Sequence, residues 1–153
     1  MSNRKVAIIV AKGGMDEVYP SLILANGARQ SGIDVAMFFT FYGLDAITEK
    51  KVDHLHVNMT GNASSPIPTV VAGLPGMESV AATMMKKQLE ELEIPTPREM
   101  LEMVSDMGAE IYACELAMKM FKLDKDDLIE QVQDVITVGD FYDVSEGAQI
   151  IYT

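Results

Sequence analysis

Residues 5–14 of the chain read KVAIIVAKGG, and this stretch decides the fold class. Residues 6–11 are all apolar, and a lysine flanks them at each end. An uninterrupted run of this kind is typical of a central parallel strand that is covered on both faces. Two glycines then end the run, and Asp16 is positioned to cap a helix that reaches Ser31, although Pro20 allows a later start. The stretch therefore predicts a strand followed by a helix.

The same alternation continues to the end of the chain, with short connections between the predicted elements. A single domain over residues 1–153, with a mostly parallel sheet of about five strands between helices, is therefore expected: a three-layer α/β sandwich. Thr96, Pro97 and Glu99 form a capping-box pattern at the start of one helix. The further predicted strands are 33–41, 110–113, 135–138 and 149–152, and the further predicted helices are 78–93, 97–108, 114–122 and 140–146.

Residues 52–77 are the least regular part of the chain, because glycine, proline, serine and asparagine recur through them. A stretch of this length without regular structure inside a compact domain is usually functional or mobile. We therefore expect it to close a pocket with the ends of the first two strands.

Composition excludes several classes of protein. The net charge is -11, from 12 basic and 23 acidic residues, which argues against a nucleic-acid or acidic-membrane partner. No apolar run is long enough to span a bilayer, and no signal peptide is expected. The single cysteine excludes an intrachain disulfide and fits a reducing cytoplasm.

Cys114 stands where an apolar strand pattern, 110–113, meets an apolar helix pattern, 114–122. Parallel-sheet proteins place reactive groups at such junctions, and a helix N-terminus favours the nucleophilic thiolate. Glu115 opposes thiolate formation if its carboxylate faces the sulfur. The alternative is an inert buried thiol, since free cysteines are among the most buried residues.

Three other patterns carry weaker signals. Gly13 and Gly14, with Lys12 beside them, match neither nucleotide-binding glycine signature, so a plain turn or an anion held by backbone N–H groups are both open. His54 and His56 would face the same way on a strand, as metal ligands or as exposed side chains. The acidic cluster at 124–127 lacks the glycine and glutamate of a calcium loop and predicts helix capping. We expect no metal and no cofactor.

Four segments, in their order along the chain, resemble the DsrE/DsrF/DsrH-like sulfur-carrier family. They are KVAIIVAKG (5–13), FFTFYGL (38–44), the pair GLPGM (73–77) and ATMMKK (82–87), and IYACELAM (111–118). The resemblance covers nearly the whole chain and implies a flavodoxin-like α/β sandwich that forms homo-oligomers, often trimers or hexamers. It also implies that Cys114 corresponds to the sulfur-carrying cysteine, which accepts sulfane sulfur as a persulfide or thiosulfonate and passes it to a partner protein.

Three hypotheses follow for function. The first is a cytoplasmic sulfur carrier or sulfurtransferase with Cys114 as the acceptor, served by sulfur-donor and sulfur-acceptor proteins. The second is a non-catalytic assembly or regulatory subunit, and the third is a small-ligand-binding or nucleotide-binding module. For the first, position predicts that Lys12, Gly13 and Gly14 receive an anionic sulfur species, Thr40 and Tyr42 orient it, and Met77 and Met118 form apolar walls. With a single thiol, mechanisms that need two cysteines are disfavoured.

Overall fold

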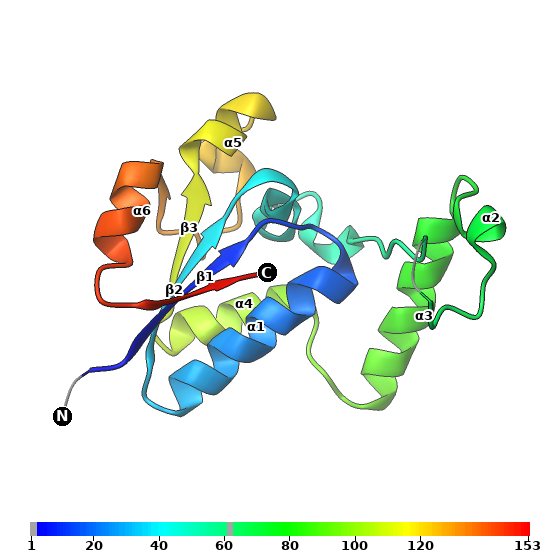
Figure 1. The fold of residues 1–153 in the computed structure, drawn as a ribbon, viewed down its shortest axis with the longest axis horizontal. Helices are drawn as coiled ribbons and strands as arrows, with labels where there is room; N and C mark the ends of the chain where they lie inside the picture. The colour runs from blue at the N-terminus through cyan, green and yellow to red at the C-terminus, as the bar shows by residue number, and fades with distance from the viewer. Residues whose placement is uncertain (1–2, 61–62) are drawn as a thin grey trace.

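Five parallel strands form the sheet in the computed structural model, which describes residues 3–60 and 63–153 (Figure 1). The order across the sheet is β4-β3-β2-β1-β5, so β1 is flanked by β2 and β5. The predicted α/β fold with a parallel sheet of about five strands is confirmed. The strands are β1 (Lys5–Val10), β2 (Asp34–Phe39), β3 (Glu110–Cys114), β4 (Asp134–Ile136) and β5 (Gln149–Tyr152).

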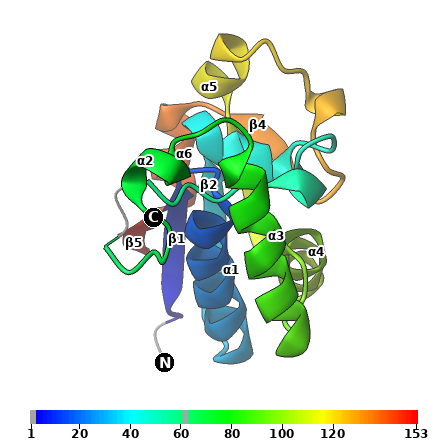
Figure 2. The same ribbon diagram turned by 90° about the vertical axis from the view of Figure 1, so that its right-hand side faces the viewer.

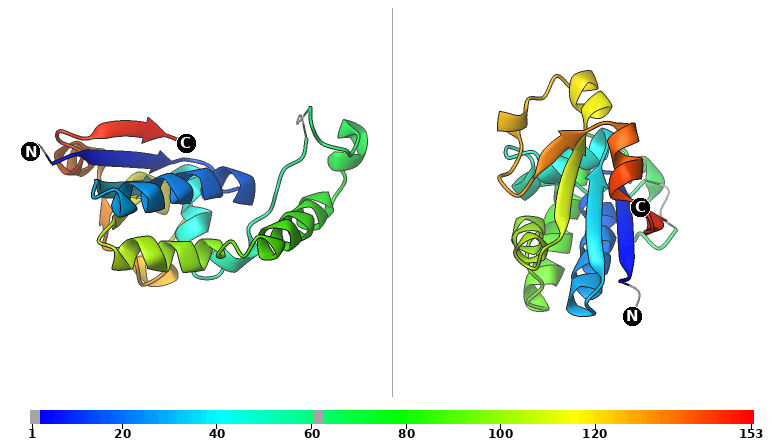
Figure 3. Two further views of the ribbon diagram at one scale, coloured as in Figure 1. Left: turned by 90° about the horizontal axis from the view of Figure 1, so that it is seen from below. Right: turned by 90° about the vertical axis from the view of Figure 1, so that its left-hand side faces the viewer.

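Helices lie on both faces of this sheet. Figures 1 and 3 show α1 and α4 against one face and α6 against the other, while α5 lies beyond the edge where the strands end. The longer helices are α1 (Met15–Gln30), α3 (Met77–Glu91) and α4 (Pro97–Asp106). The shorter ones are α2 (Thr69–Ala72), α5 (Glu115–Met120), α6 (Val138–Val144) and the 3-10 turns η1 (Phe41–Ile47), η2 (Val52–His54) and η3 (Lys125–Asp127).

The core forms around the central strand that the opening stretch of sequence predicts. Ala7, Ile8 and Val10 of β1 are buried, and Val18 and Leu22 of α1 are fully buried beside them. Burying one such valine, leucine or isoleucine side chain contributes roughly 1.5–3 kcal/mol. This layer fixes β1 and α1 and therefore the loop between them.

The start of α1 and the end of β2 differ from the prediction. Gly14, in extended conformation, caps α1, so Asp16 lies inside the first turn, where a carboxylate interacts favourably with the helix dipole, and Pro20 is accommodated within the helix. The predicted strand 33–41 ends at Phe39 instead, because Phe41 has φ +48° and turns the chain into η1. A side chain in this region is strained, which makes the end of β2 a special position.

The irregular segment leads into an arm formed by α2 and α3, which Figures 1 and 3 show extending away from the body. Within the described part of 52–77, regular structure is limited to η2 and the four-residue α2, as the composition predicts. Ala81 and Ala82 of α3 are buried, but Val70, Val80 and Met84 leave large exposed areas on the arm.

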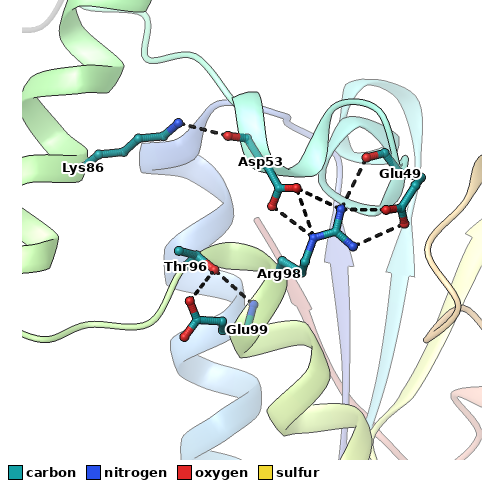
Figure 4. A network of polar contacts seen from close by, with 6 residues as sticks. All are labelled: Glu49, Asp53, Lys86, Thr96, Arg98 and Glu99. Carbon is teal, nitrogen blue, oxygen red and sulfur yellow. Dashed lines mark hydrogen bonds and ion pairs between the residues drawn. The ribbon is translucent and has the colours of Figure 1, made fainter.

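A polar network ties the arm to the body (Figure 4). The guanidinium of Arg98 on α4 donates to the carboxylates of Asp53 and Glu49, and Lys86 of α3 donates to the backbone oxygen of Asp53 at 3.0 Å. The Arg98 hydrogen bonds hold the pKa of Asp53 below its ordinary value, against the opposing effect of burial. Next to this network, Thr96 accepts from the backbone N–H of Glu99, which confirms the predicted cap of α4.

Candidate functional site

Cys114 is the last residue of β3 and caps the N-terminus of α5, so the predicted strand–helix junction is confirmed. Within the sheet it pairs with Ile136 of β4. Its exposed fraction is 4%, so a solvent molecule reaches only the edge of the residue. The thiol therefore lies at the carboxyl end of the sheet but beneath the surface.

The helix that follows Cys114 separates its two apolar stripes between the core and the surface. Ala117 and Met118 are buried on the same stripe as Cys114, while Leu116 and Met120 are more than half exposed. Met118, which belongs to α5 itself, therefore packs in the core. The exposed stripe gives α5 an apolar outer surface close to Cys114 in sequence and space.

The carboxylate of Glu115 is held by a neighbouring lysine. Its Oε1 lies 2.7 Å from Nζ of Lys119, one helical turn along α5. An exposed pair of this kind is worth little in stability, but it offsets the negative charge next to Cys114.

The end of β2 lies between the residues that follow β1 and those that follow β3. Thr40 donates its backbone N–H to the carbonyl of Val10, and the strained Phe41 and the exposed Tyr42 come next. The ring of Tyr42 contacts that of Phe121, the residue that ends α5, with centroids 5.4 Å apart. This contact joins the end of β2 to the helix that begins after Cys114.

A cleft of about 770 Å³ opens at the carboxyl end of β1. Its walls come from the loop after β1, from η1 and the residues after it, from the segment at 54–60, and from the end of α2 and the first turn of α3. The lining residues are Ala11, Lys12, Gly13, Gly14, Glu17, Tyr42, Asp45, Lys50, Lys51, His54, Leu55, His56, Asn58, Thr60, Ala72, Gly73 and Glu78. The first two strand ends and the irregular segment do form a cleft, but the expected pocket around Cys114 is not this one, because the lining does not include the thiol.

The predicted site residues are divided between this cleft and the surroundings of Cys114. The cleft contains Lys12, Gly13, Gly14 and Tyr42, and its lining does not include Thr40, Met77, Met118 or Cys114. Met77 begins α3, which Figure 1 shows apart from α5.

Sheet order explains this division. Because β2 lies between β1 and β3, the chain ends that carry Lys12 and Cys114 are two strand spacings apart, roughly 10 Å.

Gly13 in the loop after β1 and Gly43 in η1 allow these two segments to pack closely. A Cβ atom on Gly13 would collide with the backbone oxygen of Tyr42, and one on Gly43 would collide with that of Val10. At the start of α1, the N–H of Met15 donates to the carbonyl of His56 at 2.9 Å. The loop is therefore a tight turn against η1. The N–H of Met15 already donates within the protein, so it is not free to bind an anion.

The cleft also contains Lys50 and Lys51, which the sequence assigned to no site, and the two histidines, for which it left metal ligation or simple exposure open. Lys50 and Lys51 follow η1, and His54 and His56 lie on either side of the buried Leu55, both facing the cleft. The alternation of these exposed histidines with buried residues could have indicated that both point the same way, although the segment forms no strand. No group of three or more potential metal ligands occurs among residues 3–60 and 63–153.

Tyr112, two residues before Cys114, stays protonated over the physiological range. Burial raises its pKa to about 12, and its hydrogen bond to the carboxylate of Glu110 at 2.9 Å acts in the same direction.

Within the part of the chain that the structure describes, no helix has the length and apolar content needed to cross a membrane.

Comparison with known proteins identifies the family of this chain. The chain is 33% identical over 141 residues to the sulfur carrier protein DsrE2 of Allochromatium vinosum, covering 87% of each protein. It is 20% identical to the uncharacterized protein YrkE of Bacillus subtilis, covering 95% of this chain and 94% of YrkE.

Two solved structures share the fold. The ychN protein from E. coli has a TM-score of 0.59 at 15% identity, and MTH1491 from Methanobacterium thermoautotrophicum has a TM-score of 0.53 at 14% identity. Each match covers 99% of this chain and all of the other. A family model, the DsrE/DsrF/DrsH-like family, matches residues 2–151. The chain therefore belongs to the DsrE/DsrF/DrsH-like family.

Proposed function

We propose that the protein carries sulfane sulfur on Cys114 and passes it to a partner protein. The observation that supports this most strongly is the position of the only thiol, at the carboxyl end of β3 in a chain of this family. A relative that shares a third of its residues is named a sulfur carrier, which supports the same role here.

The proposed chemistry is an exchange at sulfur without net oxidation or reduction. The Cys114 thiolate attacks the outer sulfur of a donor persulfide; a sulfur–sulfur bond forms on Cys114, the donor's sulfur–sulfur bond breaks, and the donor leaves as a thiolate. With tetrathionate as donor, thiosulfate leaves and a thiosulfonate group stays on Cys114. An acceptor thiolate then removes the carried sulfur by the same exchange and regenerates the Cys114 thiolate.

Access to the thiol is the step on which this role depends. At 4% exposure, the sulfur must be uncovered by movement of α5 or of the end of β2. The exposed side chains of Phe41, Leu116 and Met120 offer an apolar surface on which a donor or acceptor protein can dock. We propose that Thr40, which follows β2, and Met118, on α5, hold the thiol in place.

We also propose that the chain assembles with further copies of itself, as a trimer or hexamer. The arm supports this proposal, because Val70 is 84% exposed and Leu74, Val80 and Met84 leave about half of their surface uncovered. Apolar residues on a projecting element are typical of subunit interfaces. Light scattering of the intact protein and of a Val80→Glu/Met84→Glu variant tests it: a smaller species is expected for the variant, and equal masses would contradict the role of the arm.

The transfer step is tested with a loaded protein. Cys114 is first charged with polysulfide and freed of excess donor, and a small acceptor thiol is then added under anaerobic conditions. We expect one sulfur atom per chain to leave the protein and appear on the acceptor, and none from Cys114→Ser. Retention of the sulfur by the folded protein would contradict a carrier role.

We propose that the protein works in the cytoplasm, where a single free thiol stays reduced.

A further inference from the structure

The cleft beside β1 has a composition that the carrier function does not use. Both histidines of the chain and three of its twelve lysine and arginine residues line it, in a protein of net charge -11. Three of the 23 acidic residues, Glu17, Asp45 and Glu78, also contribute. Three lysines and three carboxylates therefore balance in the cleft, whereas carboxylates outnumber basic residues by 23 to 12 in the whole chain.

Two of the three lysines form ion pairs at the protein surface. Nζ of Lys12 lies 3.8 Å from Glu17, and Nζ of Lys51 lies 3.1 Å from Asp45, with both lysine side chains about 60% exposed. Lys50 makes no ion pair with any residue that the structure describes. Since exposed pairs are worth about 0–1 kcal/mol, an incoming phosphate can replace these carboxylates at little cost.

Tyr42 is the aromatic residue in the lining of the cleft. It is 64% exposed, and its ring contacts the ring of Phe121. A fixed, exposed ring is a platform on which a planar heterocycle can stack. Lysines and an exposed aromatic residue in one cleft match a ligand that carries both phosphate and a base.

Size and location agree with a small-molecule site. A volume of about 770 Å³ lies in the range of ligand pockets, which is roughly 300–1,000 Å³. The cleft opens at the carboxyl end of β1, on the side of η1, and its lining includes no residue of β5. Open α/β sheets bind ligands in crevices outside the carboxyl ends of their strands.

From these observations we infer that the cleft is a second binding site, separate from Cys114, for a phosphate-bearing aromatic ligand of the nucleotide class. Lys12, Lys50 and Lys51 hold the phosphates, and the base stacks on Tyr42. His54 lies beside Lys50 and Lys51 on the same wall and contributes a further polar contact. The lining of the cleft does not include the thiol, so we expect the site to bind its ligand without Cys114.

Calorimetric titration of the intact, folded protein with ADP tests this site. We expect saturable binding to one site, with adenosine and pyrophosphate each at least roughly tenfold weaker because each lacks one half of the recognition. Lys50→Ala/Lys51→Ala is expected to weaken ADP binding by roughly tenfold or more, and Tyr42→Ala by roughly tenfold, whereas Tyr42→Phe keeps it.

Matched controls separate the cleft from the rest of the protein. Lys87→Ala changes an exposed lysine on α3 outside the cleft, and Cys114→Ser removes the thiol; both are expected to bind ADP as the unmodified protein does. Absence of saturable binding at millimolar ADP would overturn the inference. Pyrophosphate binding as tight as ADP binding, or binding that is insensitive to Tyr42→Ala, would overturn the nucleotide assignment.

Discussion

The rings of Tyr42 and Phe121 lie 5.4 Å apart, and through this contact the wall of the cleft supports the helix that begins after Cys114. Tyr42 belongs to η1, next to the end of β2, and Phe121 ends α5. A contact between these two segments therefore affects how firmly α5 covers the thiol.

Removing the Tyr42 ring is expected to make Cys114 easier to reach. An aromatic pair contributes about 0.5–1.5 kcal/mol beyond its buried area, so Tyr42→Ala should raise the rate of iodoacetamide labelling of the native protein roughly 2–10-fold. Tyr142→Ala, which removes a similarly exposed ring on α6, should leave the labelling rate unchanged. Equal rates for all three proteins would show that the Tyr42–Phe121 contact does not control access.

Close packing at Gly43 leads to a second prediction. A Cβ there would collide with the backbone oxygen of Val10, so Gly43→Ala should lower the free energy of unfolding by about 1–3 kcal/mol. Gly27 is the matched position, since a Cβ in this exposed turn of α1 meets nothing within 4 Å. Gly27→Ala should raise stability by about 0.5–1 kcal/mol. Urea unfolding curves measure both, and a stabilised Gly43→Ala protein would contradict the packing of η1 against β1.

The network around Arg98 predicts a dependence of stability on pH. Because the pKa of Asp53 is lowered in the folded state, its contribution is present above the ordinary carboxyl pKa of about 3.9 and is lost as pH falls through the lowered value. Asp53→Asn should therefore cost stability at pH 7, by about 1 kcal/mol or less because the carboxylate is half exposed, and much less near pH 2.

Unfolding free energies of Asp53→Asn at the two pH values check this prediction. Asp126→Asn serves as the control, since Asp126 is an exposed carboxylate without a pairing partner among the described residues. The same loss of stability at both pH values would mean that the Asp53 carboxylate is not charged in its contact with Arg98.

Much of the fold follows from local patterns in the sequence. The apolar run at β1 and the cap at Thr96 depend only on neighbouring residues, and both are found where the pattern predicts them. The strand–helix junction at Cys114 also depends only on neighbouring residues. Boundaries set by distant contacts were missed: β2 ends early because Phe41 turns against the β1 loop, which no pattern within 33–41 reveals.

The arrangement of the site could be predicted only in part, because it depends on strand order. Lys12 and Cys114 both follow strands, and sequence alone places both at the carboxyl edge of the sheet. It does not reveal that β2 separates their strands, and so it does not distinguish one shared pocket from two separate places. The presence of Lys50 and Lys51 in one cleft with Lys12 could not be predicted for the same reason, since tertiary packing alone brings these segments together.

The central claim is that Cys114 in the folded protein accepts sulfane sulfur. Intact-mass spectrometry after incubation of the reduced, native protein with polysulfide or tetrathionate tests this most directly, with labelling in urea to confirm that the thiol is free. The account predicts one adduct per chain that dithiothreitol removes and that Cys114→Ser does not form. A native protein that takes up no sulfur from either donor, while its thiol reacts fully in urea, would contradict it.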